Sequence, residues 1–240
     1  MVVATPSGIT LAPEGGAHQS VSTPLIGMGQ PGLTSYEPAF ADELALIMGW
    51  AFEHMQADDG GSVYLRLSTR TIDQPQRPDL SALAGDIIDG AYWLKPPAPG
   101  AELAIAYCGA LAPEALDAYE QVLEDIPGAG LLAVTSPDRL YADWQAGGSN
   151  HAERLLSGLA PDAALVTVLD GHPATLAWLG SVANHHIVPL GVDRFGQSGD
   201  LPDLYREYGI DTDAILDAAA TALTKRMRKA GGAPLRLAAE

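Results

Sequence analysis

The sequence predicts an α/β protein with a mostly parallel sheet. Apolar segments with strand-like patterning alternate with amphipathic segments at helical spacing through most of the chain, and this alternation is typical of β-α repeats. Several strand segments are continuously apolar, as expected for strands that are buried on both faces. The chain has 240 residues, of which 47% are apolar and 18% charged, so it can bury a core without a disulfide or a metal.

The N-terminal part offers one clear helix and one clear strand. Apolar residues recur at helical spacing after Pro38, and ADDGG ends the run. The segment SVYLRLST follows as a strand, with Val63, Leu65 and Leu67 on one face. Residues 73–82 are expected to form a linker, because proline is frequent there and apolar side chains are few. The inward residues of the predicted helix are Phe40, Leu44, Ile47, Met48, Phe52 and Met55.

Residues 83–240 carry several β-α repeats and are expected to form a complete domain. Pro189 predicts that the last strand of this part ends there or lies at a sheet edge, because proline cannot donate a ladder hydrogen bond. The predicted strands are 87–94, 101–109, 128–136, 162–171 and 185–192, and the predicted helices are 112–126, 137–144, 151–159, 173–183, 201–209 and 211–230.

Residues 1–72 do not suffice for a complete domain of this type. One helix and about two strands cannot cover both faces of a parallel sheet. We therefore expect an unpaired sheet edge and an apolar helix face that a partner must cover.

Charge and composition exclude several classes of function. Acidic residues outnumber basic ones 30 to 13, for a net charge of -17, which opposes binding to nucleic acid. No apolar run approaches the roughly eighteen residues of a membrane span, and the N-terminus does not resemble a secretory signal. The single cysteine, Cys108, allows no internal disulfide and lies in an apolar run, where we expect an inert core thiol. These features predict a soluble, cytoplasmic protein.

The common catalytic and metal-binding motifs are absent. The sequence contains no GxSxG, no GxxxxGK[ST] and no GxGxxG, which removes the usual anchors of serine hydrolases, P-loop proteins and dinucleotide-binding proteins. The histidines form no HExxH and no metal-spaced cluster, so no metal site is predicted.

The segment TLAPEGGAHQS is the first candidate site. It places Glu14, His18 and Gln19 around Gly15 and Gly16, and glycines allow a tight backbone that a small oxygen-rich ligand can approach closely. Histidine can donate to a developing oxyanion or transfer a proton near neutral pH. The alternative is an ordinary glycine-rich turn with a surface histidine.

The segment GVDRFGQSGD, residues 191–200, is the second candidate. Its glycines flank Asp193 and Arg194, and it leads into a predicted helix whose N-terminus could hold an anion. The alternative is that Asp193 and Arg194 pair and fix the loop.

Both candidate segments resemble sequences of the transketolase superfamily. TLAPEGGAHQS, followed by an apolar stretch and YEPAFADELALIM, resembles the last part of the pyrimidine-binding domain of that superfamily. There a related stretch carries an acidic residue, a glycine and a terminal His-Gln pair, which Glu14, Gly15, His18 and Gln19 match. GVDRFGQSGDLPDLYREYGI resembles the C-terminal domain of the superfamily, where a Gly-Val-Asp-Arg-Phe-Gly run precedes a helix.

Within the superfamily, PEGGAHQS, VYLRLSTR and LAWLGSVA look most like the homodimeric decarboxylating component of 2-oxo acid dehydrogenase complexes, of the pyruvate dehydrogenase type. That family uses thiamine diphosphate and magnesium to decarboxylate a 2-oxo acid and to pass the acyl group to a lipoyl arm. The resemblance implies that His18 is catalytic and hydrogen-bonds the substrate oxygen. It implies that Glu14 and Gln19 belong to the substrate-binding loop, with Glu14 orienting other groups. The implied partners are a second copy, or the missing N-terminal domains, and a lipoyl-bearing acyltransferase component.

The chain also departs from the superfamily. The Gly-Asp-Gly motif that anchors magnesium and diphosphate is absent, and DGH (residues 170–172) lies in the C-terminal unit and is no substitute. The resemblance therefore implies the C-terminal third of such an enzyme: a partial pyrimidine-binding unit over 1–72, the linker 73–82, and a transketolase C-terminal-like domain over 83–240. We expect no cofactor-binding residues in this chain and no activity in isolation.

The residues alone leave other functions open. The substrate could be 2-oxoglutarate, another 2-oxo acid or, in a transketolase-type enzyme, a sugar. A dicarboxylate would require an extra cation, for which Arg66 and Arg70 are candidates, although a surface pair after a strand is the favoured interpretation. A non-catalytic dimerisation or regulatory module is the alternative from a different class.

Overall fold

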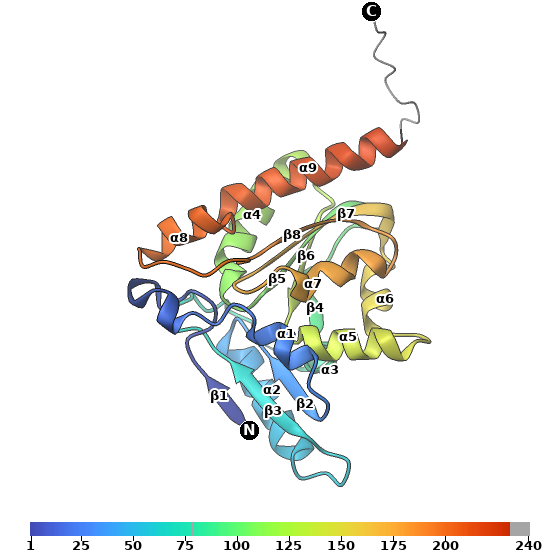
Figure 1. Ribbon diagram of the computed structural model, residues 1–240. Coiled ribbons are helices and arrows are strands. Elements are labelled where there is room, and N and C mark those ends of the chain that lie inside the picture. Colours follow the sequence, from blue (N-terminus) through green and yellow to red (C-terminus); the bar gives the residue numbers. More distant parts are fainter. Residues whose placement is uncertain (78, 231–240) are drawn as a thin grey trace, which may run out of the picture.

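The computed structural model describes residues 1–77 and 79–230 and contains two β-sheets (Figure 1). The strands are β1 (Val2–Ala4), β2 (Leu33–Tyr36), β3 (Ser62–Arg66), β4 (Ala91–Lys95), β5 (Ala101–Cys108), β6 (Gly130–Val134), β7 (Leu159–Leu169) and β8 (His186–Leu190). The smaller sheet has the order β1-β3-β2 and the larger one the order β4-β6-β5-β7-β8. Only β4 pairs antiparallel, with β6. The predicted α/β class with mostly parallel sheets is confirmed.

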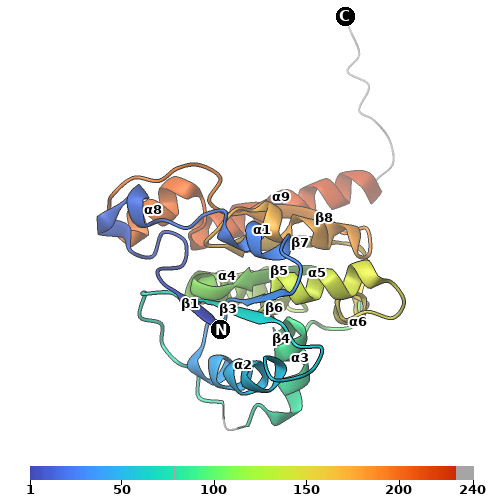
Figure 2. The same cartoon turned by 60° about the horizontal axis from the view of Figure 1, so that its bottom comes forward.

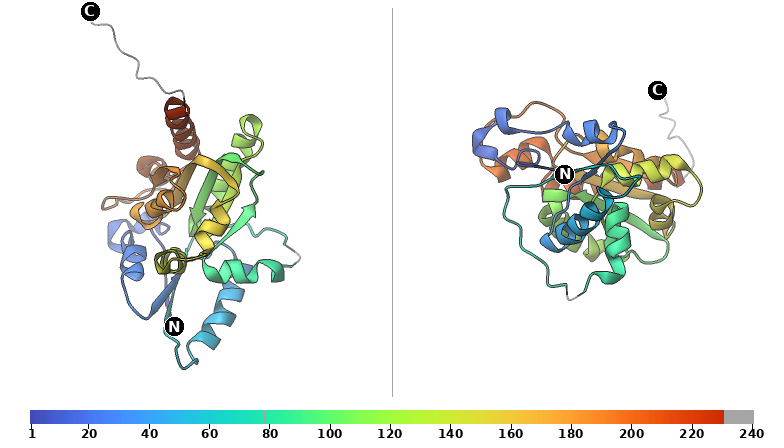
Figure 3. Two further views of the ribbon diagram at one scale, coloured as in Figure 1. Left: turned by 90° about the vertical axis from the view of Figure 1, so that its right-hand side faces the viewer. Right: turned by 90° about the horizontal axis from the view of Figure 1, so that it is seen from below.

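Helices cover the sheets and connect the parallel strands. They are α1 (Thr23–Met28), α2 (Ala41–His54), α3 (Ala84–Asp89), α4 (Ala112–Asp125), α5 (Pro137–Ala146), α6 (His151–Leu156), α7 (Ala174–Ala177), α8 (Leu201–Tyr208) and α9 (Thr212–Ala230). Helices α2 and α9 lie on opposite sides of the molecule (Figures 2 and 3). In the part of the chain that the structure describes, none of these helices is long and apolar enough to cross a membrane.

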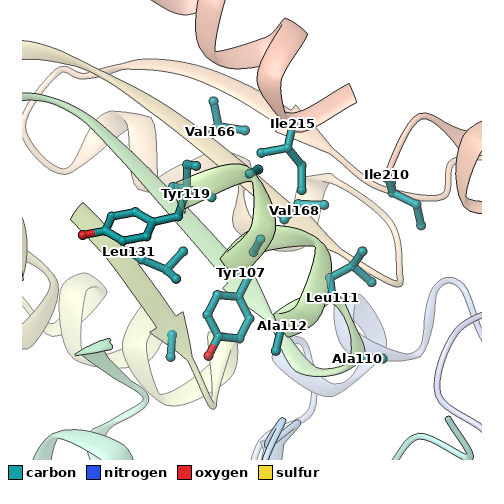
Figure 4. Packing of buried hydrophobic residues seen from close by; sticks show 14 of the residues in the cluster. Tyr107, Ala110, Leu111, Ala112, Tyr119, Leu131, Val166, Val168, Ile210 and Ile215 are labelled. Atoms are coloured by element: carbon teal, nitrogen blue, oxygen red, sulfur yellow. The ribbon is translucent and has the colours of Figure 1, made fainter. Parts of the chain in front are cut away.

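The larger sheet is buried on both faces because helices pack on each of them, and successive side chains of β5 point to opposite faces. Leu103 and Ile105 pack in one cluster with helices α4 and α9, whereas Ala104 and Ala106 pack in a second cluster with α5, α6 and α7. Figure 4 shows Ile215 of α9 beside the β7 residues of the first cluster. This two-sided burial explains why the strand is continuously apolar from Leu103 to Cys108.

The two parts of the chain share one core. Ile47 of α2 and Leu65 of β3 belong to the same buried cluster as Leu103 and Leu111 of the larger unit. The boundaries at residues 72 and 82 remain predictions, although no helix or strand lies in 67–77 or 79–80. Residue 78 of the predicted linker and residues 231–240 of the predicted second domain lie outside the described residues.

The carboxyl ends of the parallel strands in the larger sheet meet the N-terminal part of the chain, which contains the smaller sheet and is called the smaller unit below. The Glu37 backbone N–H donates to the Thr135 carbonyl at 2.7 Å, just after β6. The Ile9 N–H donates to Oδ1 of Asp170 at 2.9 Å, just after β7. In open α/β sheets, ligands bind at this edge, so the junction of the two units is the expected place for a site.

Most predicted elements are present, and the differences have local causes. The predicted strand over 87–94 is partly wrong, because its first residues end α3. Gly90 then adopts a φ of 111°, a left-handed conformation that suits glycine at a helix end, and β4 begins only at Ala91. The predicted helix over 173–183 is α7 followed by a 3-10 turn at Trp178–Ser181. The edge position of Pro189 is confirmed, since β8 is an edge strand. Cys108 is a buried free thiol, as predicted.

Candidate functional site

The first candidate segment forms a compact loop between β1 and α1, which we call the histidine loop (residues 5–22). Two short 3-10 helices, Ala12–Glu14 and Gly16–His18, follow each other within it. Gly15 joins them with a φ of 73°, a backbone conformation that residues other than glycine rarely adopt. The base is closed by the Ser20 N–H, which donates to the Gly8 carbonyl at 3.1 Å.

The histidine loop presents Glu14 and His18 to solvent. Their side chains are 58% and 52% exposed, and Oε2 of Glu14 lies 4.0 Å from Nδ1 of His18. This distance exceeds hydrogen-bond range. Both residues therefore remain accessible to a ligand or to a covering chain, and their predicted roles stay predictions.

Gln19, unlike Glu14 and His18, forms a hydrogen bond with the second candidate segment. Its Nε2 donates to the backbone carbonyl of Gln197 at 3.3 Å. Its Oε1 lies against Gly196, where an added Cβ would come within 1.6 Å of that oxygen. Gln19 thus connects the histidine loop to residues 191–200, which we call the C-terminal loop.

The two candidate segments, which lie about 170 residues apart in the sequence, contact each other in the folded chain. The Gly199 N–H donates to the Ala12 carbonyl at 3.2 Å. A Cβ on Gly15 would meet Oγ of Ser198 at 2.4 Å, and one on Gly16 would meet the Phe195 ring at 2.4 Å. The glycines of the first segment are therefore required for this close approach. Figure 1 shows the histidine loop in dark blue beside α8 in orange.

A groove of about 370 Å³ adjoins this contact. Its lining includes Gln19 and Ile26 from the N-terminal part, together with His172, Arg194 and Phe195. Phe195 is 84% exposed and Ile26 is 59% exposed. A polar and aromatic groove at the edge of a parallel sheet is suited to a small molecule or to an inserted peptide segment.

The pair Asp193–Arg194 fixes the C-terminal loop. The Arg194 guanidinium donates to the Glu207 carbonyl at 2.9 Å and to its carboxylate at 3.0 Å, and it lies 3.4 Å from Asp193. It also covers the Tyr208 ring at 4.8 Å. These contacts favour the loop-fixing interpretation over the anion-binding one.

A buried charged cluster beside the histidine loop was not predicted from the sequence. Arg66 is 2% exposed and forms an ion pair with Glu37, so its interpretation as a surface residue was wrong. Its second terminal nitrogen donates to the carbonyl of Asp170 at 2.6 Å and to that of Ser20 at 2.8 Å. Burial raises the pKa of the Asp170 carboxyl to about 7, although the neighbouring Arg66 charge acts to lower this pKa.

Arg70 is engaged in its own ion pair. Its two terminal nitrogens donate to the two carboxylate oxygens of Glu114, each at 2.7 Å, and its guanidinium stacks over the Tyr205 ring at 5.3 Å. The bidentate geometry fixes the side chain. Both arginines considered for a dicarboxylate substrate are therefore already paired with carboxylates of this chain.

The described residues do not fit a bound metal ion. In 1–77 and 79–230, no group of three or more His, Cys, Asp and Glu side chains could hold one. The sequence likewise lacks a Gly-Asp-Gly motif for a diphosphate.

The fold is that of the C-terminal part of transketolases, in agreement with the fold that the sequence resemblance implied. Transketolase from Leishmania mexicana matches with a TM-score of 0.73 and 18% identity, over 98% of this chain and 32% of its own. The H261F transketolase mutant from Pichia stipitis matches with a TM-score of 0.71 and 21% identity, over 94% of this chain and 30% of its own. A split gene transketolase, described as an inactive beta4 tetramer, matches with a TM-score of 0.68 and 22% identity, over 92% and 66%.

Within this class, the chain is similar to a particular enzyme component. It is 28% identical to the pyruvate dehydrogenase E1 component of Mycolicibacterium smegmatis over 92% of its own length. It spans only 25% of that protein, and about a third of the transketolase chains from Leishmania mexicana and Pichia stipitis. No family model matches the chain.

Proposed function

We propose that this chain is the C-terminal segment of a thiamine diphosphate-dependent pyruvate dehydrogenase component, which decarboxylates pyruvate and transfers the acyl group to a lipoyl arm. The similarity to a pyruvate dehydrogenase E1 component over 92% of the chain carries the proposal. The joined loops support it, because they place both candidate segments at the ligand-binding edge of a parallel sheet. The chain is proposed to be inactive without the remaining domains.

His18 is the proposed catalytic residue. Its half-exposed imidazole can donate a hydrogen bond to a substrate oxygen or move a proton near neutral pH. Glu14, whose carboxylate lies 4.0 Å from the His18 imidazole, is proposed to orient neighbouring groups on the substrate side. Gln19 is proposed to support this loop through the Gln197 carbonyl, which its Nε2 already contacts.

The cofactor belongs to the assembled enzyme. Thiamine diphosphate and magnesium are proposed to be held by residues outside this chain, since the described residues offer no metal-binding group. The proposed partners are a second copy or the N-terminal domains of the same enzyme, and a lipoyl-bearing acyltransferase component. The cytoplasm is the proposed compartment.

Three alternatives are each supported or weakened by a separate observation. The solved structures described above are transketolases, which favours a sugar-transferring enzyme of the same fold. A 2-oxoglutarate enzyme is less well supported, because Arg66 and Arg70 are paired with Glu37 and Glu114. The match to a split gene transketolase described as inactive favours an assembly or regulatory module without catalysis.

Isolation of the native complex tests the proposal. We expect the chain, purified from its own cells with thiamine diphosphate and magnesium, to have a native mass that includes the missing domains, and to turn over pyruvate with a lipoyl acceptor. A cofactor-free monomer or homodimer without turnover would support the non-catalytic module instead.

The His18→Ala variant tests the proposed catalytic role. In the assembled complex, we expect turnover to fall by about 10²-fold or more, as for loss of a general acid-base or oxyanion-stabilising group. Glu120→Ala, at an exposed position of α4, is the control and should keep normal turnover. Equal turnover of His18→Ala and the control would contradict the assignment.

A further inference from the structure

The segment Asp170–His172 follows β7 and contacts both loops of the candidate site. Its sequence, DGH, is no substitute for the Gly-Asp-Gly motif that the chain lacks. Asp170 is fully buried and lies at the carboxyl end of a central strand, where its side chain can reach the smaller unit. Its position raises the question of what a buried carboxyl group holds there.

Toward the histidine loop, the segment contacts both ends. Oδ1 of Asp170 accepts a hydrogen bond from the Ile9 N–H at 2.9 Å, near the start of the loop. The His172 N–H donates to the Val21 carbonyl at 3.0 Å, near its end. Between these ends lie all three proposed site residues of the loop.

Toward the C-terminal loop, the segment makes a second pair of contacts. The Val192 N–H donates to the Gly171 carbonyl at 2.8 Å, at the start of that loop. The Tyr205 hydroxyl, from helix α8 that follows the loop, donates to Oδ2 of Asp170 at 3.4 Å. The two carboxylate oxygens of Asp170 therefore face elements from the two ends of the chain.

The backbone of the histidine loop at Gly8 packs closely against Asp170. A Cβ added to Gly8 would lie 2.0 Å from Oδ1 of Asp170 and 2.3 Å from its backbone carbonyl. Arg66 joins the same group of atoms, because one terminal nitrogen donates to the carbonyls of both Asp170 and Ser20. Gly8 and Ser20 are the residues that close the base of the histidine loop.

We propose that Asp170 is a positioning residue, whose carboxyl group fixes the histidine loop against the C-terminal loop and so orients His18. Its meaning for catalysis rests on the proposed function. The ordering of the two loops does not, because it is a property of this chain alone.

Amide hydrogen exchange of the purified chain tests the proposal without cofactor or substrate. The His18 and Gln19 amides donate within the loop to the Gly15 and Gly16 carbonyls, so their exchange reports on its order. In Asp170→Ala, we expect these two amides and that of Val192 to exchange about tenfold faster or more, while the amides of β5 keep their rates. Asp170→Asn retains an oxygen for the Ile9 N–H and should keep exchange near the normal rate.

A glycine pair provides a test that leaves Asp170 unchanged. Gly8→Ala would push the Asp170 carboxyl away from the loop and should reproduce the faster exchange of His18 and Gln19. Gly32→Ala is the matched control, since Gly32 also has a positive φ, of 74°, but nothing within 4 Å of an added Cβ. The control separates the effect of lost contact from that of backbone strain, and Gly8→Ala decides the case if Asp170→Ala does not fold.

The outcomes separate this proposal from the proposed function. Faster exchange at Ile9 alone, with His18 and Gln19 unchanged in a folded Asp170→Ala chain, would overturn the positioning role. Equal exchange in Gly8→Ala and Gly32→Ala would overturn it as well. Neither result bears on whether the native complex turns over pyruvate, which the isolation experiment measures.

Discussion

At the scale of single residues, Arg66 shows what strand periodicity can and cannot reveal. Alternation along β3 correctly predicts that Val63 and Leu65 face the core. It places Arg66 on the opposite face, which was interpreted as solvent-exposed. That face is covered by chain segments distant in sequence, since Asp170 lies 104 residues away from Arg66. Local patterns carry no information on such a partner, so neither the buried cluster nor the role of Asp170 could be predicted.

The Asp170 carboxyl should make stability depend on pH. Its pKa is about 7 in the folded chain against a usual value of 3.8, so between these values the folded chain holds a proton that the unfolded chain has released. Its contribution to stability is therefore complete at low pH and is lost as pH rises from about 4 to about 7. The charges facing it are those of Arg66 and Glu37, and the Tyr205 hydroxyl donates to it.

The Asp170→Asn variant isolates this contribution. The amide cannot release a proton, so between pH 5 and pH 8 the free energy of unfolding of the variant should rise relative to the unsubstituted chain by about 1–3 kcal/mol. Urea unfolding at both pH values measures the difference. Asp203→Asn, whose carboxylate is 70% exposed, is the control. A constant difference between Asp170→Asn and the unsubstituted chain across this range would contradict the prediction.

At the scale of elements, helix α2 was predicted closely because its sequence determines it locally. The Glu43 carboxylate accepts hydrogen bonds from the Ala39 and Phe40 N–H groups at 2.8 and 3.1 Å, which satisfies donors at the helix start. The apolar stripe is correct at Ile47, which is fully buried, but not at Phe52, which is 50% exposed. Spacing predicts a face, and tertiary packing decides how wide the buried part of that face is.

Truncation of these two residues should have unequal effects. Ile47→Ala leaves a cavity in the shared core and should lower the free energy of unfolding by about 2–5 kcal/mol. Phe52→Ala removes contacts on a half-exposed surface and should cost less than about 1.5 kcal/mol. Urea unfolding of both variants at one pH measures the contrast. Similar losses would mean that Phe52 is covered in solution, for example by another chain.

At the scale of the whole molecule, the sequence correctly predicts the α/β class of fold, whereas the division at residues 72 and 82 and the function of the two loops stay predictions. It does not predict that the loops touch, because Gln19 and Gln197 are 178 residues apart and meet only when both units have folded. Nor does it predict that the units share a core. Ile47 and Leu65 pack in one cluster with Leu103 and Leu111, across the predicted linker.

The shared core determines the behaviour of the N-terminal part alone. Residues 1–72, expressed without the rest, would expose part of the apolar surface of Ile47 and Leu65, which belong in the full chain to a buried cluster with residues beyond position 82. Val2 and Val3 on the edge strand β1 are already 57% and 54% exposed, and an unpaired edge with apolar side chains promotes association. We therefore expect this fragment to self-associate or precipitate, as measured by light scattering over a range of concentrations, while residues 1–240 under the same conditions scatter less. A monomeric fragment with a sharp unfolding transition would show that the smaller sheet is stable by itself, and that the shared cluster is dispensable for folding of this unit.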